Sequence, residues 1–283
     1  MNKLIPWTIF IDMLGYRNIN GKITEENSAN EFISFMTSNE QVFSAQDSKK
    51  IKKAYSEGAF NLYAFYEIKT LFVSDSLVIT YYPKEQKDEI NELHYYMHSA
   101  NALIIIIKRL QTFIYKCLHE KEIFIRGGIS NKFAKIEQNF AVGEGLIEAY
   151  ETESKVAIYP RICLSKSVSE NEKLILTFNK LCKWIYGVDS FLKEDNGVYF
   201  LDYLKHHITD PELFLAQKIV KHSFFSVHKE SIEKKLVEVD MLIANENDIK
   251  RKQGLLKIKI KYDWIKNYHN STLISYDKQY IIQ

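Results

Sequence analysis

Apolar residues in the first two thirds of the chain follow two patterns. Short runs rich in β-branched and aromatic residues predict strands, and apolar positions spaced three or four residues apart predict helices. The runs predict strands at Trp7–Met13, Tyr63–Ile68, Thr70–Tyr81, Glu122–Ser130, Phe140–Val142, Tyr159–Leu164 and Val198–Tyr203. The helical spacing predicts helices at Ser28–Ser44, from about Asp88 to Lys121, and at Glu144–Glu153.

Polar stretches between these runs predict the connections. The lysine-rich segment Asp47–Gly58 is expected to be exposed. A polar hairpin turn is expected at Asn131–Gln138, after which Phe140–Val142 continues the sheet.

From Pro211 onward the pattern is helical, with a polar break near Asn245–Asp248 and a second helix to about Asn267. The basic and aromatic stretch Lys257–His269 suits either nucleic-acid binding or an amphipathic helix that docks on the rest of the protein. Docking is favoured by the apolar residues Ile258, Ile260, Trp264 and Ile265.

Strands separated by helices predict an α+β fold in which helices pack on one face of a sheet. We expect a domain over residues 1–205, which carries the strands, and a C-terminal helical extension over residues 206–283.

The composition narrows the class of protein. The chain has 38 basic and 36 acidic residues among 283, and this net charge of +2 lacks the basic excess of nucleic-acid-binding proteins. A hydrophobic content of 46% excludes a disordered chain. The N-terminal apolar run is too short to cross a membrane and is interrupted by Asp12, so no membrane association is expected. The odd, widely spaced set Cys117, Cys163 and Cys182 favours a reducing, cytoplasmic location.

Several common catalytic motifs do not occur in the sequence. It contains no HExxH, no CxxC pair, no GxxxxGK[ST] loop and no GxSxG. Their absence argues against zinc proteases, zinc ribbons, P-loop NTPases and α/β-hydrolases.

Two aspartates interrupt apolar strands. Asp12 lies within Trp7–Leu14, and Asp75 lies within Leu71–Tyr82. A buried carboxylate needs a partner, because an unpaired buried charge is very unfavourable, and neither strand offers an adjacent Lys or Arg at that point. Each aspartate taken alone also fits a turn or capping role. Magnesium is commonly held by one or two carboxylates together with substrate phosphates, so the pair suggests a metal site, with Gly15 suited to close backbone approach.

Four segments resemble, in order, the motifs of class III nucleotidyl cyclases. They are FIDMLGY at Phe10–Tyr16, VSDS at Val73–Ser76, IRGGIS at Ile125–Ser130 and AVGEGLIEAYETE at Ala141–Glu153. The set spans roughly residues 5–203, and it looks most like the bacterial Pycsar pyrimidine cyclases of antiphage defence. The resemblance implies a ferredoxin-like βαββαβ core and a homodimer that forms head to tail.

The resemblance also implies a site. Asp12, Asp75 and the carbonyl of Met13 would bind two divalent ions, Mn²⁺ or Mg²⁺, and the backbone N–H groups of Leu14, Gly15 and Tyr16 would hold the β- and γ-phosphates. The ribose 3′-hydroxyl then attacks the α-phosphate and pyrophosphate leaves. The product would be cyclic UMP or cyclic CMP, which activates a separate effector.

The sequence departs from the family at four positions. Leu71 and Phe140 occupy the positions that read adenine or guanine, and an apolar pair cannot satisfy a purine edge. This favours UTP or CTP as substrate. UTP is preferred only because we expect uridylate cyclases to be the commoner type. The alternative is that the alignment to the family motif is shifted by two residues, because Lys69 lies close to Leu71. Ile147 and Glu151 replace the transition-state Asn and Arg of the family.

Arg126 is the residue that we expect to supply the missing positive charge to the polyphosphate. It stands on an otherwise apolar strand, where the alternative role is an ion pair at a sheet edge. Lys132, Lys135 and Arg161 are further candidates for this charge.

Two other functions stay open at this point. One is an adenylyl or guanylyl cyclase with an atypical base pocket. The other is a catalytically inactive cyclase-like domain that binds nucleotide or a partner as a regulator. Ile147 and Glu151 favour the inactive domain, whereas retention of Asp12 and Asp75 argues against it.

Overall fold

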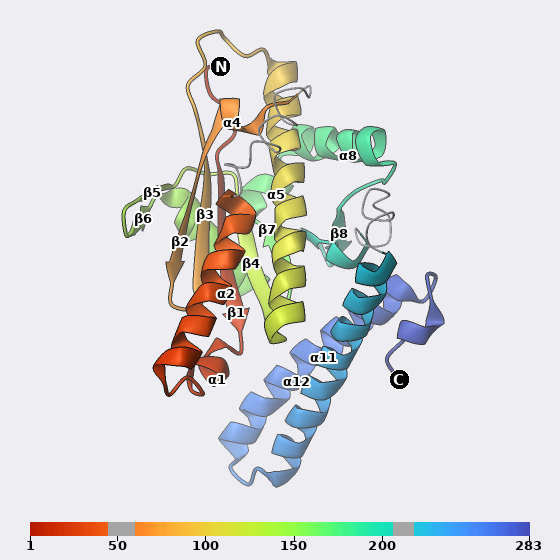
Figure 1. Ribbon diagram of the computed structural model, residues 1–283. Coiled ribbons are helices and arrows are strands. Elements are labelled where there is room, and N and C mark those ends of the chain that lie inside the picture. The colour runs from red at the N-terminus through yellow and green to blue at the C-terminus, as the bar shows by residue number, and fades with distance from the viewer. Residues whose placement is uncertain (45–59, 206–217) are drawn as a thin grey trace.

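A sheet with the strand order β2-β3-β1-β4-β7-β9-β8 forms the centre of the protein (Figure 1). The computed structural model describes residues 1–44, 60–205 and 218–283. The strands of this sheet are β1 (Trp7–Leu14), β2 (Tyr66–Val73), β3 (Ser76–Pro83), β4 (Phe124–Ser130), β7 (Ile162–Leu164), β8 (Leu192–Asp195) and β9 (Val198–Leu201). β1 pairs antiparallel with β3 and β4, whereas β4 and β7 are parallel.

Helices connect and cover the strands. Those in the described ranges are α1 (Tyr16–Asn20), α2 (Glu26–Ser44), α4 (Leu62–Phe65), α5 (Glu92–Lys121), α6 (Glu144–Glu151), α7 (Lys166–Ser169), α8 (Glu172–Tyr186), α11 (Lys218–Asn245) and α12 (Ile249–Leu273). A π-turn, η2 (Thr152–Val156), follows α6, and a 3₁₀ turn, η3 (Lys278–Tyr280), follows α12. The fold is therefore α+β, and the elements from β1 to β4 follow one another as a βαββαβ unit.

The two faces of the sheet differ in what covers them. Figure 1 shows α2 and α5 crossing one face side by side. Side chains alternate between the faces along a strand, and Trp7, Ile9 and Ile11 of β1 belong to the buried core that includes residues of α2 and α5. On the opposite face α6 packs against β1, where the rings of Phe10 and Tyr150 lie 5.3 Å apart.

Gly128 allows α6 to approach the sheet closely. A Cβ atom at this position would lie 2.2 Å from the carbonyl oxygen of Ala149 and 2.7 Å from Cβ of Thr152. No residue other than glycine fits without moving the helix, so Gly128 sets the distance between α6 and β4.

The C-terminal helices form a hairpin that shares the core of the sheet. Phe224 of α11 contacts Tyr115 of α5 at 5.3 Å between ring centroids. On α12, Tyr262 lies 6.0 Å from Phe124 of β4. Phe224 and Ile265 belong to the same buried cluster as β1, so the hairpin and the sheet have one continuous core.

The β segments predicted at Tyr63–Ile68 and Thr70–Tyr81 divide at a different point, and the turn role that the sequence allowed for Asp75 is confirmed. Instead of a break near Lys69, one strand continues to Val73 and the chain turns at Ser74–Asp75. The prediction of a strand from Tyr63 was also wrong, because Asn61 caps the short helix α4 with its side chain.

Phe140–Val142 does not continue the main sheet, contrary to the prediction. It forms strand β6 of a separate two-stranded sheet with β5, Lys135–Glu137, which lies within the segment predicted as a turn. The hairpin is tight because Gln138 adopts a left-handed conformation with φ of 51°.

Smaller differences concern the ends of elements. α5 begins at Glu92 rather than near Asp88, because the side chain of Asn91 caps it. The helix that begins at Glu144 ends at Glu151, where η2 follows. α8 and β8 were not predicted. The segment Asp47–Gly58 and the predicted helical start at Pro211 lie outside the described residues.

The prediction that Lys257–His269 docks on the rest of the protein is confirmed for two of its four named apolar residues. Trp264 and Ile265 pack on the core, whereas Ile258 and Ile260 are exposed. The helix also continues beyond Asn267 to Leu273. In the described ranges no helix is long and apolar enough to cross a membrane. The three cysteines are buried and free.

Candidate functional site

Asp12 and Asp75 meet at one end of the sheet. Asp12 lies opposite Ser76 of β3, and Asp75 directly precedes Ser76 in the turn between β2 and β3. The N–H of Met13 donates a hydrogen bond of 3.1 Å to the carbonyl oxygen of Asp75. The N–H and C=O of a residue in an extended strand point to the same side, so the Met13 carbonyl faces the Asp75 turn. The structure thus brings together the three predicted metal ligands.

Two local conformations build this end of the sheet. Ser74 has a φ of 59°, which allows the tight turn that presents Asp75. Gly15 has a φ of 87° and ends β1 before α1 begins at Tyr16. Side chains with a Cβ rarely adopt such a conformation, so the turn at Leu14–Gly15 depends on its glycine.

Arg126 of β4 lies between two carboxylates. Its Nε donates a hydrogen bond to Oδ2 of Asp12 at 3.0 Å, and the same atom lies 2.6 Å from Oε1 of Glu153 in η2. The Glu153 side chain is only 3% exposed, and that of Asp12 is 17% exposed. Arg126 therefore neutralises a predicted metal ligand in this structure and forms the ion pair that was the alternative to a polyphosphate contact.

Glu153 and Lys261 are members of this group that the sequence analysis did not identify. Burial raises the pKa of Glu153; the charges of Asp12 and Asp75 raise it further, whereas those of Arg126 and Lys261 lower it. The pKa of Lys261, on α12, is lowered by burial and by Arg126. A sequence signal for Glu153 was its position at the end of the AVGEGLIEAYETE segment, and single π-turns within helices often mark functional sites.

The charges in this group do not balance. Three carboxylates, Asp12, Asp75 and Glu153, face two cations, Arg126 and Lys261, which leaves a formal charge of −1. Ionisable groups that perturb one another in this way occur preferentially at functional sites, although structural ion pairs do the same. We call these five residues the carboxylate cluster.

The two predicted base-contacting residues lie on neighbouring elements. Leu71 is half-buried on β2, opposite Val78. Phe140 lies on the β5–β6 hairpin and is 70% exposed. The hairpin is joined to β2 by an ion pair of 3.4 Å between Lys69 and Glu137. Leu71 and Phe140 thus border the open face of the sheet, without forming a closed pocket around a base.

The other predicted sources of positive charge have carboxylate partners outside the cluster. Lys132 pairs with Glu144, and Lys135 lies 3.5 Å from Glu137. The third, Arg161, is buried.

Arg161 forms a second ion pair of an arginine with an aspartate on the same sheet. Its Nη1 lies 3.1 Å from Oδ2 of Asp195. Its guanidinium lies 5.1 to 5.3 Å from the ring centroids of Tyr159, Phe200 and Trp264. This arginine holds β7, β8 and α12 together.

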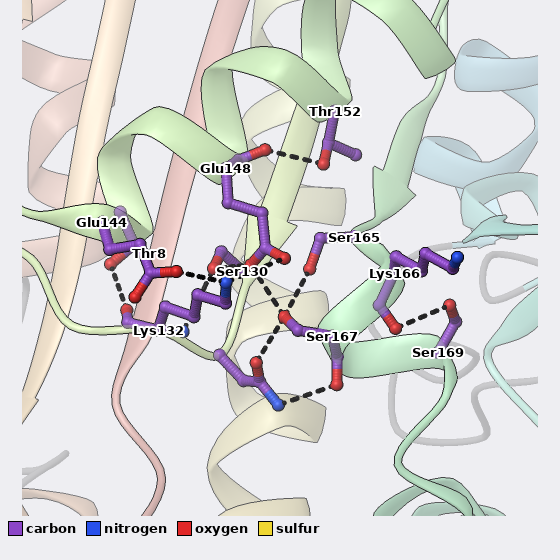
Figure 2. Close-up of polar contacts among 11 residues, drawn as sticks. Thr8, Ser130, Lys132, Glu144, Glu148, Thr152, Ser165, Lys166, Ser167 and Ser169 are labelled. Atoms are coloured by element: carbon purple, nitrogen blue, oxygen red, sulfur yellow. Dashed lines mark hydrogen bonds and ion pairs between the residues drawn. The ribbon is translucent and has the colours of Figure 1, made fainter.

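Figure 2 shows a hydroxyl network that fixes α6 against the end of β4. Ser130 and Ser167 both donate hydrogen bonds to Oε2 of Glu148, that of Ser167 at 2.7 Å. Thr8 of β1 donates to the carbonyl oxygen of Lys132 at 3.0 Å. These contacts tie α6 and α7 to the ends of β1 and β4, and they hold η2 with Glu153 in place.

The donor atoms at this end of the sheet suit a hard divalent cation. Carboxylate and carbonyl oxygens are typical ligands of Mg²⁺ and Mn²⁺. Within the described ranges, no three His, Cys, Asp or Glu side chains gather closely enough to hold a metal by themselves. Asp12, Asp75 and the Met13 carbonyl would therefore supply part of a coordination sphere, and water and substrate phosphates the rest, which is common for Mg²⁺.

Comparison with known proteins does not assign the chain to a family. No family model matches the sequence. No curated protein matches it significantly.

Proposed function

We propose that the protein is a metal-dependent pyrimidine nucleotide cyclase of the class III type. The observation that carries the proposal is the meeting of Asp12 and Asp75 beside the Gly15 turn, at one end of a βαββαβ unit. The strand order β2-β3-β1-β4 of this unit agrees with the ferredoxin-like core that the motifs imply.

In this proposal the protein binds and orients a nucleoside triphosphate. Asp12, Asp75 and the Met13 carbonyl hold divalent ions, which supply charge neutralisation at the phosphates when bound. The N–H groups of Leu14, Gly15 and Tyr16 hold the β- and γ-phosphates. The ribose 3′-oxygen forms a bond to the α-phosphorus and loses its proton to water, while the bond to the leaving pyrophosphate breaks. Most of the catalysis is then positioning and electrostatic stabilisation.

The charge of the carboxylate cluster supports joint binding of metal and nucleotide. A formal charge of −1 is too small to balance two divalent ions by itself. The triphosphate supplies the missing negative charge, so both ions bind tightly only with the nucleotide present.

The base preference rests on Leu71 and Phe140. Both offer apolar surface, and neither donates or accepts a hydrogen bond to a purine edge. UTP is the proposed substrate and CTP the next candidate. A cytosolic location and a separate effector that binds the cyclic nucleotide belong to the same proposal.

A second copy of the chain is the proposed partner. Large apolar side chains are exposed on the face that α2 and α5 leave uncovered, and such patches mark interaction surfaces. These residues are Val73, Phe140, Val142, Ile147 and Tyr150. A homodimer would cover them and close the open side of the base-binding region, as closed two-fold symmetry allows.

The test is product formation by the purified protein with Mn²⁺ and each of ATP, GTP, CTP and UTP, measured by mass spectrometry. Asp75→Ala is the inactive variant. Asp189→Ala, which removes a 90% exposed aspartate in the segment after α8, is the matched control. A cyclic pyrimidine monophosphate from the wild type and the control, but not from Asp75→Ala, supports the proposal. A cyclic purine product would show that Leu71 and Phe140 do not read the base.

A catalytically inactive regulator is the second candidate function. It is favoured by the ion pair between Arg126 and Asp12, and by Ile147 and Glu151 in place of the family's Asn and Arg. Metal-dependent nucleotide binding without any product would identify this function.

A further inference from the structure

Two aromatic contacts hold α12 over the end of β4. The ring of Tyr262 lies 6.0 Å from Phe124, two residues before Arg126, and Trp264 stacks on Tyr159 at 5.1 Å. These contacts fix the position of the helix on both sides of Asp263. They place Lys261 where its ammonium group interacts with Arg126, Asp12 and Glu153.

Lys261 makes no ion pair within the described part of the chain, unlike several other lysines of the hairpin. Lys234 pairs with Glu122 at 2.7 Å, and Lys235 pairs with Glu238 at 2.8 Å. Lys261 is only partly exposed and lies next to a second cation, Arg126. A half-buried ammonium without a direct partner is unfavourable, and an anionic ligand would supply that partner.

A basic groove is lined by Tyr262, the residue that follows Lys261 on α12. It has a volume of about 250 Å³ and runs between the Leu14–Gly15 turn and the hairpin. Four lysines and two glutamates line it, which gives two excess positive charges: Lys22, Lys121, Lys234, Lys235, Glu122 and Glu238.

The two lysines that carry this excess lie outside the C-terminal hairpin, Lys22 after α1 and Lys121 at the end of α5. Within the described residues, Lys22 and Lys121 have no carboxylate partner, whereas Lys234 and Lys235 have one each. A groove with unpaired cations at the turn that ends β1 suits a ligand with several negative charges.

We infer that the C-terminal hairpin completes an anion site in which Lys261 binds a phosphate group and the groove lysines hold the rest of a polyphosphate chain. The identity of the ligand as the tail of a nucleoside triphosphate rests on the proposed function. Lysine is a common phosphate ligand. Lys261 would supply from the end of the chain the positive charge that Glu151 cannot supply from α6.

Inorganic triphosphate is the probe, and the full-length protein is titrated by calorimetry without metal at low ionic strength. Lys261→Met is expected to weaken binding ~10-fold, as the loss of one charge-assisted contact does. Lys261→Arg should retain most of the affinity. Lys257→Met removes an exposed lysine one helical turn earlier and should bind as the wild type does.

Lys121→Met is a second variant that does not touch the cluster, and it should weaken binding about threefold because it removes one charge at the groove. Thermal denaturation checks that each variant is folded. The inference is overturned if the wild type does not bind triphosphate, or if Lys261→Met binds equally well. If Lys261→Met is unfolded, an unchanged affinity of Lys121→Met overturns the inference and a weakened one supports it. Triphosphate binding that depends on Lys261, together with no cyclic product from any nucleotide, would uphold the anion site and refute the cyclase function.

Discussion

Two sets of polar side chains that involve α12 differ in whether each donor has an acceptor. One is a chain of hydrogen bonds through two histidines, and the other is the carboxylate cluster. In the first, Tyr203 lies 2.7 Å from Nε2 of His228, whose Nδ1 lies 2.8 Å from Nδ1 of His269. Nε2 of His269 lies 2.8 Å from the carbonyl oxygen of Tyr280. A carbonyl only accepts, so His269 carries its proton on Nε2, His228 donates to His269, and Tyr203 donates to His228. This assignment follows from the partners.

In the carboxylate cluster the cations and carboxylates are not paired one to one. Arg126 serves both Asp12 and Glu153, while Lys261 has no direct carboxylate partner among the described residues. A fully satisfied buried network stabilises one structure. The hydrogen bonds from Tyr203 through His228 to His269 thereby hold the hairpin on the sheet. A group with unequal charges next to a turn and a groove is suited to bind an ion or ligand instead. The contrast separates a structural role from a functional one.

The largest effect is expected from a comparison of two ion pairs, Arg126–Asp12 in the cluster and Arg161–Asp195 outside it. It tests whether the cluster has a functional role or only a structural one. Asp12→Asn should lower product formation on the order of 10³-fold, because it removes a proposed metal ligand at the phosphates. Asp195→Asn breaks the pair with Arg161 on the same sheet. It should leave the turnover of the folded enzyme within about threefold of wild type, since no reacting group is touched. Both variants are assayed by mass spectrometry. An equal loss in both would mean that the cluster has no special role.

Loss of Arg126 tests how strongly the cluster depends on its shared cation. Arg126→Met should lower the free energy of unfolding by about 3 kcal/mol, because Glu153 stays buried without its partner. Urea denaturation gives this value. Because the pKa of Glu153 is already raised in the folded protein, the deficit should shrink as the pH falls and the carboxylate is protonated. A deficit independent of pH would contradict this account.

For the hydrogen-bonded histidines His228 and His269 we expect the opposite pH dependence, namely a loss of stability as the pH falls. Burial lowers the pKa of His269 from 6.5 to about 4. The unfolded chain therefore takes up a proton first, and the contribution of His269 is complete above pH 6.5 and is lost as the pH falls toward 4. The loss is about 3 kcal/mol at 1.36 kcal/mol per pH unit. Urea denaturation from pH 7 to pH 4 measures it.

His269→Gln is the control, because Glu153 contributes with the opposite sign in the same range. The difference between wild type and variant isolates the histidine. A difference that stays constant between pH 7 and pH 4 would show that His269 is protonated within the folded protein at no extra cost.

The smallest change in stability is expected at the open face beside the cluster. Phe140→Ser should change the free energy of unfolding of the monomer by less than about 0.5 kcal/mol, because the side chain is 70% exposed. It should raise the dissociation constant of the proposed dimer, measured by sedimentation. Trp184→Ser, at a residue 77% exposed on α8, is the control that should leave association unchanged. Equal effects of both would place the dimer contact elsewhere.

Local patterns in the sequence were sufficient for the parts of the site that lie within single strands. Asp12 stood out because it interrupts WTIFIDM, and Asp75 because it interrupts a long β-branched run. A turn at Asp75 was one of the two roles that the sequence allowed, because the polar Ser74–Ser76 interrupts a run that is apolar on both sides. α+β was predictable from alternating strands and helices.

Residues that join the site from other elements were not predictable in the same way. Glu153 reads as a solvated helix residue until the close approach of α6 at Gly128 buries η2. Lys261 lies in a stretch where every second residue from Lys257 is basic, so periodicity alone does not show which lysine faces the core. That choice depends on Tyr262 and Trp264 packing against residues far away in the sequence.

The central position of β1 also has a consequence in time. β1 is the first strand to be synthesised, yet Thr8 pairs with Ser130 of β4, roughly 120 residues later. At a synthesis rate of about 5 to 20 residues per second, this strand waits roughly 6 to 24 s on the ribosome for its second neighbour. Until β4 emerges, β1 can pair only with β3, and the sheet around Trp7, Ile9 and Ile11 stays incomplete. One edge of β1 therefore stays open to other partners until β4 emerges, and open strand edges favour aggregation.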